Sequence, residues 1–339
     1  MRDIAQRMGV STVTVSKALG GKEGVSDKVR EEIIAVATEM GYKKNLVAKD
    51  MRDGTTHNIG ILISERHSKS GYSSMKIQQE LSKQLLDNSY YAIFEVIEPE
   101  YEESGKPPRL ILENKVDGII ILGQLRPSYV NIILSSRLPA IFVDFSQDQY
   151  PVDTIICDNV YGGYVLTNHL LSLGHRRIAF IGNPMYSTAV MDRYLGYYKA
   201  LMEQGVEFDP ALVIHDTNEF GHEVEMNLPT ADETAYVCLT CQRAYQIMKD
   251  LQQNGLKIPE KISVVAFDED HFATLSNPPL TTFSVDVSVM AATAAQTILS
   301  RVKHPNASFA RKTISGKLTI RQSSTRNTPA GWDTLRRFG

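Results

Sequence analysis

From residue 59 onward, short runs rich in β-branched and aromatic residues alternate with longer segments whose apolar residues have helical spacing. Alternation of this kind is typical of α/β folds, in which helices cover the faces of parallel sheets. Several runs are apolar almost throughout, as expected for strands that are buried on both faces. The expected strands span residues 59–63, 91–97, 116–122, 140–144, 154–157, 178–181, 212–215, 235–239, 262–267 and 281–285, and the clearest helices span 75–87, 160–173, 190–204 and 243–253.

Residues 1–41 lack this alternation and instead predict three short helices. The first apolar stripe is interrupted by Gly9, which suits a tight turn, and Ser11 is a good N-cap for a second helix over 12–19. Ser26 is placed to cap a third helix. Three short helices with a glycine turn between the first two form a helix-turn-helix.

The second of these helices would leave four side chains exposed, namely Thr12, Val13, Ser16 and Lys17. A helix fits the major groove of B-DNA, where hydroxyl groups can bond to phosphates or base edges and a lysine can reach guanine. The alternative is a three-helix scaffold with a solvated polar face, because the same geometry also occurs in proteins that do not bind DNA.

The segment that follows the three predicted helices, residues 41–52, is basic. It carries four positive side chains against one negative one: Lys43, Lys44, Lys49 and Arg52 against Asp50. Residues 45–51 could form a helix capped by Asn45, but a helix of this length is marginal alone in water. A basic segment that folds only on a partner is typical of a hinge that forms on DNA.

Polar residues follow several of the expected strands, at the edge where the carboxyl ends of parallel strands meet. Ligands of open α/β sheets bind at this edge. Several acceptors collected there suit a ligand with many hydroxyl groups, although each acidic residue taken alone is more often a turn former or a helix cap. These residues are Ser64, Glu65, Asp144, Asp158, Thr240, Cys241, Asp268 and Glu269.

Composition narrows the class of protein. The 339 residues include 36 Lys and Arg against 39 Asp and Glu, so no global positive field indicates nucleic acid. Three cysteines in this length argue against a disulfide framework and favour a reducing compartment. No apolar run approaches the about 20 residues of a membrane span, and the start lacks the apolar core of a signal peptide. We therefore expect a cytoplasmic protein without membrane contact.

Signals for catalysis are weak. Neither a G-x-S-x-G nor a Walker motif occurs. Cys238 and Cys241 form a CxxC, which zinc or redox chemistry could use, but a single pair without further ligand spacing is more typical of structural cysteines. An enzyme would need a nucleophile or a metal besides the acidic strand ends. We expect no catalytic residue, no metal and no cofactor, and keep a sugar-acting enzyme as an alternative.

Residues 3–51 resemble the DNA-binding headpiece and hinge of the lactose-repressor (LacI/GalR) family of bacterial transcription regulators. The matching segments are Asp3-Ile4-Ala5, Gly9-Val10-Ser11, Thr14-Val15-Ser16-Lys17, Gly24-Val25-Ser26, Gly41-Tyr42 and Asn45-x-x-Ala48. In that family the second helix enters the major groove, and paired hinge helices insert a leucine into the minor groove at the position that Met51 occupies here. Methionine is also an apolar residue that can intercalate.

The resemblance implies that DNA contacts come from the second helix, its flanks and the hinge. The family usually has arginine in place of Lys17, whose ammonium lacks the bidentate fork, and proline in place of Lys44, which adds a phosphate contact. The implied DNA-binding residues are Ser11, Thr12, Val13, Thr14, Ser16, Lys17, Ser26, Asn45, Ala48 and Met51.

The resemblance continues to about Ser323, through Val116-Asp117-Gly118, Asp158-Asn159, residues 174–182, 262–268 and 277–282. It implies a core of two periplasmic-binding-protein-like lobes with parallel sheets, joined by crossovers near 157–160, 283–286 and 311–315. The implied organisation is a headpiece over 1–44, a hinge and linker over 45–57, a core over 58–326 and a tail over 327–339. The first lobe takes about 58–157 and 286–312, and the second about 158–283 and 313–326.

By alignment, Asp144, Arg193 and Asp268 match the effector contacts of the family, and the fixed fork of Arg193 can hold sugar hydroxyls. The usual Asn-Asp of the family is replaced by Thr240-Cys241, which leaves open a ligand other than a simple monosaccharide. The expected effector site is Ser64, Glu65, Tyr72, Asp144, Asp158, Arg193, Thr240, Cys241 and Asp268.

We therefore expect a sequence-specific repressor of carbohydrate-utilisation genes that binds a palindromic double-stranded operator as a homodimer. A saccharide-like effector between the lobes would control it, by induction or by corepression, since both use the same scaffold. The tail over 327–339 lacks an apolar heptad, so no coiled-coil tetramer is expected. The alternative with the same core is a solute-binding protein without a DNA role, which the basic headpiece and the missing signal peptide disfavour.

Overall fold

The computed structural model describes residues 1–42, 54–68, 72–218, 222–226, 228 and 233–327. The chain divides into two compact units, Met1–Thr56 and His57–Gly339, and each has its own apolar core. The hinge residues Asn45, Ala48 and Met51 lie outside the described part of the chain.

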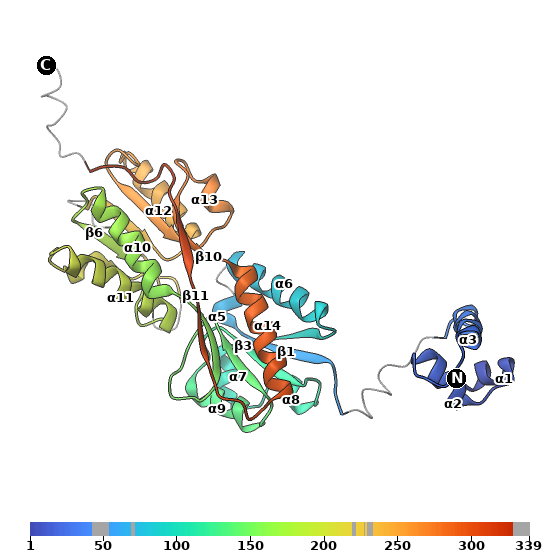
Figure 1. Ribbon diagram of the computed structural model, residues 1–339. Helices are drawn as coiled ribbons and strands as arrows, with labels where there is room; N and C mark the ends of the chain where they lie inside the picture. The colour runs from blue at the N-terminus through green and yellow to red at the C-terminus, as the bar shows by residue number, and fades with distance from the viewer. Residues whose placement is uncertain (43–53, 69–71, 219–221, 227, 229–232, 328–339) are drawn as a thin grey trace, which may run out of the picture. The chain divides into compact units, whose positions relative to one another are not determined.

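The described residues of the first unit form three helices, α1 (Arg2–Met8), α2 (Thr12–Leu19) and α3 (Asp27–Glu39), drawn in blue in Figure 1. This confirms the predicted helix-turn-helix. One apolar face of each helix turns inward, and the fully or almost fully buried side chains of the core are Ile4, Ala5, Val15, Ala18, Ile33 and Ala37.

Helix α2 begins and ends where the sequence predicted, because Ser11 caps it: its Oγ accepts a hydrogen bond from the N–H of Thr14 at 3.0 Å. The expectation for the third helix needs correction. Ser26 occupies the N-cap position, but its side chain makes no capping hydrogen bond.

The second unit contains two six-stranded sheets, each in a lobe of its own. Every neighbouring pair of strands in the first sheet is parallel, in the order β11-β5-β4-β3-β1-β2. Its strands are β1 (Asn58–Ser64), β2 (Tyr91–Ile97), β3 (Gly118–Leu122), β4 (Ala140–Val143), β5 (Asp153–Cys157) and β11 (Arg311–Ile314).

The second sheet has the order β12-β10-β9-β8-β6-β7, and all its pairs are parallel except β10 with β12. The predicted α/β architecture with parallel sheets is confirmed. The strands of this second sheet are β6 (Ile178–Ile181), β7 (Val213–Ile214), β8 (Ala235–Cys238), β9 (Ser263–Phe267), β10 (Thr281–Val285) and β12 (Gly316–Thr319).

Helices cover both faces of each sheet. On the first sheet, α6 (Tyr72–Asp87) and α14 (Val287–Lys303) pack on one face, and α7 (Pro99–Ser104), α8 (Arg109–Leu112) and α9 (Pro127–Ser135) on the other. On the second sheet, α10 (Asn159–Ser172) and α11 (Thr188–Glu203) face α12 (Cys241–Gln253) and α13 (His271–Leu275) across the strands. None of the helices in the described residues is long and apolar enough to span a membrane.

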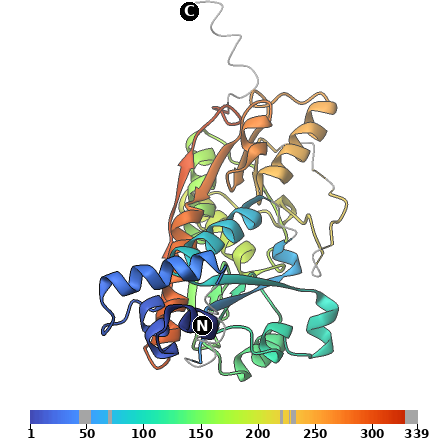
Figure 2. The same cartoon turned by 90° about the vertical axis from the view of Figure 1, so that its right-hand side faces the viewer.

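The chain passes between the two lobes three times, after β5, after β10 and between β11 and β12. Figures 1 and 2 show the two lobes end to end, with the β11–β12 segment running from one to the other. Strand β11 pairs with β5 as far as Ile314, so the first lobe extends past the limit of about 312 expected from the resemblance. Strands β11 and β12 were not predicted from the sequence, because their residues are polar and largely unburied.

Candidate functional site

The first candidate surface is the outward face of α2. Thr12, Val13, Ser16 and Lys17 are exposed, whereas Val15 is fully buried and holds the opposite face against the headpiece core. The apolar side chain of Val13 is 62% exposed, so it is open to contact with a partner such as the methyl group of a thymine base.

The residues that flank this face have local roles as well. Ser11 caps α2 and lies 2.9 Å from the Thr14 hydroxyl, with one of the two hydroxyls donating to the other. Thr14 is half-buried, and Ser26 is exposed at the start of α3. The helix therefore presents a small, polar and largely unobstructed surface, which is the kind of surface that enters the major groove.

The second candidate site is a cavity of about 840 Å³ in the second unit. Both lobes line it: Ser64, Asp144 and Cys157 come from strands or strand ends of the first sheet, and Thr240 and Asp268 from those of the second. The walls also touch directly, since the N–H of Thr188 donates to Gln124 Oε1 of the other lobe at 2.9 Å. The carboxyl ends of both sheets thus share one cleft, as the strand-end rule requires.

Two aspartates occupy matching places in the two lobes. Asp144 follows β4 and Asp268 follows β9, and each of these strands is the third in its sheet. Both aspartates have positive φ, 63° and 71°. The N–H of Asp144 donates to the carbonyl of Ile155, and that of Asp268 to the carbonyl of Phe283, at 2.9 Å in each case. Aspartate tolerates this left-handed conformation, which turns the chain sharply out of the strand at the cleft.

Arg193 of α11 is the central cation of the cleft. Its Nε donates to Asn159 Oδ1 and its Nη1 to the carbonyl of Leu239, each at 2.9 Å. The guanidinium lies over the Phe267 ring, 4.4 Å from the centroid, and its Nη2 is 3.8 Å from Asp268 Oδ1. The side chain is 14% exposed, so its fork is held rigidly with part of it still open to the cavity.

The carboxylates differ in their surroundings. Burial raises the pKa of Asp268, and the Arg193 cation opposes this rise. Asp144 Oδ2 lies 3.6 Å from His67 Nδ1, while Cys157 Sγ donates to Asp144 Oδ1 at 3.4 Å. Burial lowers the pKa of His67 and raises that of Cys157, so Asp144 faces two neutral groups. It remains an acceptor that hydroxyl donors of a ligand can satisfy.

Five of the nine expected effector residues line the cavity: Ser64, Asp144, Arg193, Thr240 and Asp268. The structure places the others elsewhere. Asp158 caps α10, where its Oδ1 accepts from the N–H of Tyr161 at 3.2 Å. Glu65 starts the short helix α5 (Glu65–Ser68) and is not part of the lining. Tyr72 begins α6, but its side chain is outside the described residues.

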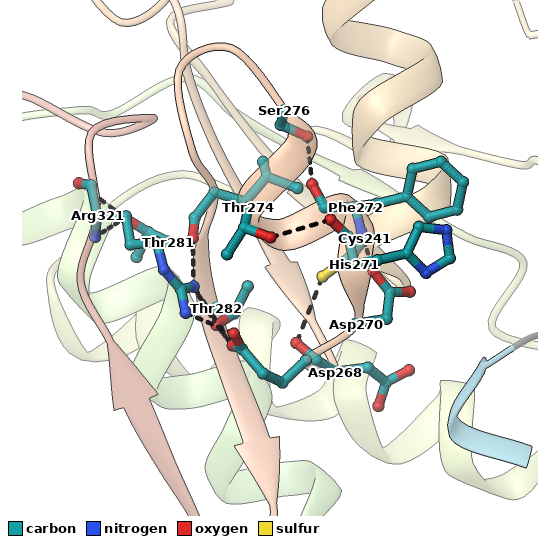
Figure 3. Close-up of polar contacts among 12 residues, drawn as sticks. Cys241, Asp268, Asp270, His271, Phe272, Thr274, Ser276, Thr281, Thr282 and Arg321 are labelled. Atoms are coloured by element: carbon teal, nitrogen blue, oxygen red, sulfur yellow. Dashed lines mark hydrogen bonds and ion pairs between the residues drawn. The ribbon is translucent and has the colours of Figure 1, made fainter. Parts of the chain in front are cut away.

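Cys241 is fully buried beneath the cleft and does not line it. Its Sγ donates to the backbone oxygens of Phe267 and Asp268, at 3.5 and 3.4 Å, and Figure 3 shows the contact with Asp268. The Cys241 thiol thus supports the turn that carries Asp268, which is a positioning role and not the expected direct contact. Figure 3 also shows Arg321, whose Nη1 donates to the carbonyl of Leu280 at 2.8 Å.

The CxxC has no ligand geometry for zinc. Cys238 and Cys241 are both buried, and burial raises the pKa of both thiols, which keeps them protonated. Among the described residues, no group of three or more His, Cys, Asp and Glu side chains could hold a metal ion.

Part of the cavity wall was not predicted from the sequence. His67, Gln124, Asp216, Glu223 and Arg243 all line it. Asp216 comes just after β7, so the strand-end rule would have found it. Gln124 follows the end of β3 by two residues, so the same rule would have found it. No such signal marks Arg243, which is on the first turn of a helix, or Glu223, which follows no strand end.

Comparisons with known proteins agree with both units. Residues 1–45 match the model for bacterial regulatory proteins of the lacI family, and residues 167–324 match the model for the periplasmic binding protein-like domain. The ribose operon repressor of Haemophilus influenzae is 26% identical over 328 residues, which cover 95% of this chain and 98% of that protein. The HTH-type transcriptional repressor PurR of Vibrio atlanticus is 26% identical and covers 89% of this chain and 92% of its own length.

Solved structures share the fold. The lac repressor dimer bound to operator and the anti-inducer ONPF has a TM-score of 0.80 at 23% identity, covering 95% of this chain and 98% of that one. A LacI family transcriptional regulator from Enterococcus faecium with bound ribose has a TM-score of 0.69 at 22% identity, covering 80% and 100%. One chain thus carries both matches in this order and aligns with repressors over almost their whole length, so it is similar in both units to bacterial regulatory proteins of the lacI family.

Proposed function

We propose that this protein is a transcriptional repressor that binds a palindromic operator as a homodimer and changes its operator affinity when a saccharide occupies the cleft. One observation carries the proposal. The same chain joins a headpiece with an exposed α2 face to a two-lobed core whose cleft holds Asp144, Arg193 and Asp268. The repressor relatives and the operator-bound and ribose-bound structures support this combination of partners.

The need for a dimer on DNA follows from the size of the headpiece. One helix-turn-helix reads only a half-site, and a two-fold dimer doubles the contact on a palindrome. The exposed Ser16 and Lys17 of α2 are placed to contact base edges and phosphates, with Thr12 at the start of the helix. We place the protein in the cytoplasm, because a repressor acts on the chromosome.

The effector step follows from the distribution of cleft groups over two lobes. Asp144 belongs to the first lobe, and Arg193 and Asp268 belong to the second. A saccharide whose hydroxyls bond to all three stabilises one angle between the lobes. That angle changes the placement of the two chain segments that lead to the headpieces of a dimer. The coupling is reciprocal, so the operator changes saccharide affinity by the same factor. The cleft groups act by binding, and we assign them no catalytic step.

The test combines operator retardation with calorimetry on the full chain. A thermal-shift screen of saccharides finds the ligand, since a ligand that binds only the folded state raises the melting temperature. We expect the wild type to retard a palindromic duplex and the saccharide to change the operator affinity. Arg193→Ala should cost about 1.5–3 kcal/mol of saccharide affinity, the range for hydrogen bonds to a charged group, and leave saccharide-free operator affinity unchanged.

Arg109→Ala is the matched control, because Arg109 is 76% exposed on α8 and does not line the cavity. It should bind both partners like the wild type. Retardation that is equal for palindromic and scrambled duplexes would contradict the DNA role. Saccharide affinity that is unchanged in Arg193→Ala would place the effector outside the cleft.

A further inference from the structure

The cleft contains a second polar group, centred on Arg243 in the first turn of α12. The Nε of Arg243 lies 3.3 Å from Asp216 Oδ2, its Nη2 donates to Glu223 Oε1 at 3.0 Å, and its Nη1 donates to Gln246 Oε1 at 2.9 Å. All four side chains line the same cavity as Asp144, Arg193 and Asp268. We call Asp216, Glu223, Arg243 and Gln246 the outer cluster.

The outer cluster extends away from the central residues along the edge of the sheet, from Arg243 on α12, which follows the neighbouring strand β8, to Asp216 after β7. Asp268 follows β9, and Asp216 follows β7 at the edge of the same sheet. The order β9-β8-β6-β7 separates these strands by three spacings, or about 14 Å at about 4.8 Å each. One sugar ring is shorter than this. The volume of about 840 Å³ also lies near the upper end of the range of about 300–1,000 Å³ for pockets that enclose drug-sized ligands.

The chemistry of the outer cluster fits hydroxyl groups. A guanidinium has five N–H donors, and the contacts to Glu223 and Gln246 use two of them. Two carboxylates accept hydrogen bonds beside it. A hydroxyl both donates and accepts, so it can bond to either kind of group. Arg243 is 14% exposed, and this burial fixes the fork in place.

The charges disfavour an anionic ligand. The outer cluster has two carboxylates against one guanidinium, which leaves a net negative charge near any incoming phosphate or carboxylate. The whole lining has the same sign: Asp144, Asp216, Glu223, Asp268, Glu269 and Asp286 against Lys76, Arg193, Arg243 and Lys317.

We propose that the effector is a neutral oligosaccharide of at least two units. One ring binds between Asp144, Arg193 and Asp268, and the next ring binds to the outer cluster. This inference rests on the proposed function, because it requires that the cleft binds a saccharide, and it adds the size and charge class of the ligand.

The experiment is calorimetry on the full chain with single sugars, linked sugars and phosphate esters. The probes are glucose, galactose, xylose and ribose, then cellobiose, maltose, lactose and xylobiose with their trisaccharides, then glucose phosphate and ribose phosphate. We expect one linked sugar to bind at least about tenfold tighter than any of its single units, a factor that corresponds to about 1.4 kcal/mol. The phosphate esters should bind more weakly than the sugars from which they derive.

Variants test the contribution of the outer cluster separately from that of the central residues. Gln246→Ala removes one wall of the outer cluster and leaves the ion pair of Arg243 with Asp216 in place, so the fold is retained. It should weaken the linked sugar about tenfold and change the single sugar less than twofold. Glu223→Gln should act in the same direction, because it removes a carboxylate acceptor. Glu225→Gln is its control, since Glu225 is exposed on the same segment and does not line the cavity.

The outcomes distinguish this inference from the proposed function. Single and linked sugars that bind equally well, or a Gln246→Ala effect that is equal for both, would overturn the two-unit ligand and leave a saccharide-controlled repressor intact. Tighter binding of a phosphate ester would overturn the neutral charge class. If no carbohydrate of the panel binds, the saccharide-controlled function and this inference are both wrong.

Discussion

Single residues in the cleft are kept in states that folding alone does not favour. Asp144 and Asp268 have left-handed backbone conformations, which are uncommon for residues other than glycine. Burial of Asp268 disfavours its charged form, and Arg193 compensates for only part of that penalty. Strained and desolvated groups of this kind cluster at functional sites, where their alignment serves a ligand. We therefore expect the cleft aspartates to lower the free energy of unfolding while they increase the affinity for a ligand.

Asp268→Asn tests this expectation through its pH dependence. The pKa of Asp268 is raised in the folded protein from the 3.8 of the unfolded chain, so the ionised carboxylate lowers the free energy of unfolding at neutral pH. The variant should be more stable than the wild type at neutral pH, and its advantage should shrink as the pH falls toward 3.8. Its saccharide affinity should fall. Urea denaturation across this pH range measures the first effect, and calorimetry the second.

Asp250→Asn is the control for this prediction, because it makes the same chemical change at a residue that is exposed on α12. A neutral-pH stability of Asp268→Asn below that of the wild type would mean that the ion pair with Arg193 outweighs the cost of burying the carboxylate.

At the scale of elements, the contact between α10 and α11 decides where Arg193 points. A Cβ on Gly163 of α10 would lie 2.0 Å from the carbonyl oxygen of Arg193, and one on Gly196 of α11 would lie 2.0 Å from the carbonyl oxygen of Val160. The two backbones touch without side chains between them. This close approach brings Arg193 within reach of Asn159 and of the end of β8.

Gly163→Ala should therefore separate the two helices. Alanine is the better helix former by about 1 kcal/mol, which would stabilise the protein if packing did not matter. The contact at 2.0 Å is with backbone, which cannot move aside as a flexible side chain does. We expect the overpacking cost of about 1–3 kcal/mol to exceed the gain in helix propensity, so that the free energy of unfolding falls. Saccharide affinity should fall as well, because Arg193 moves with α11.

Denaturant unfolding and calorimetry on the same preparation measure both effects of Gly163→Ala. Ser172→Ala at the exposed end of α10 is the control and should change neither quantity. A more stable Gly163→Ala variant with normal saccharide affinity would show that the helices tolerate the extra methyl group.

The whole molecule combines a small headpiece with a core that exposes a set of large apolar side chains. Phe94 and Val96, which share one face of β2, are 40% and 47% exposed, and Met75 and Leu86 of the neighbouring α6 are 59% and 57% exposed. Strand β2 is also the edge of the first sheet. Apolar groups on an edge strand are a liability in a monomer, which natural proteins remove by covering the edge.

We expect a second copy of the chain to cover this face, which gives the homodimer that a palindromic operator requires. Light scattering should report twice the 37.8 kDa of one chain and no tetramer. Phe94→Glu should shift the mass toward the monomer and weaken operator binding, because each monomer then holds only a half-site. Ile320→Glu is the control, since Ile320 is 63% exposed in the other lobe. A dimer of unchanged stability in Phe94→Glu would place the interface elsewhere.

Features that depend on neighbours in the chain were predictable from the sequence. Helix α2 has the predicted bounds because its signals, the Ser11 cap and the apolar spacing around Val15, lie within one or two turns. The ten expected strands are present, and several of them, such as β3, β4 and β9, are buried throughout, as their continuous apolar runs predicted. The resemblance to the family named Asp144, Arg193 and Asp268, and the tertiary structure brings all three to one cavity.

Features that depend on distant parts of the chain required the tertiary structure. Asp158 and Cys241 obeyed the same strand-end rule as Asp268, yet one caps a helix and the other is buried below the cleft. Arg243 had no local signal, because its role comes from Asp216, which follows β7, and from Glu223, which lies further along the same segment. A strand-end position places a residue at the edge of the sheet, but only the packing of helices and the three passages of the chain between the lobes determine which side chains at that edge face the same cavity.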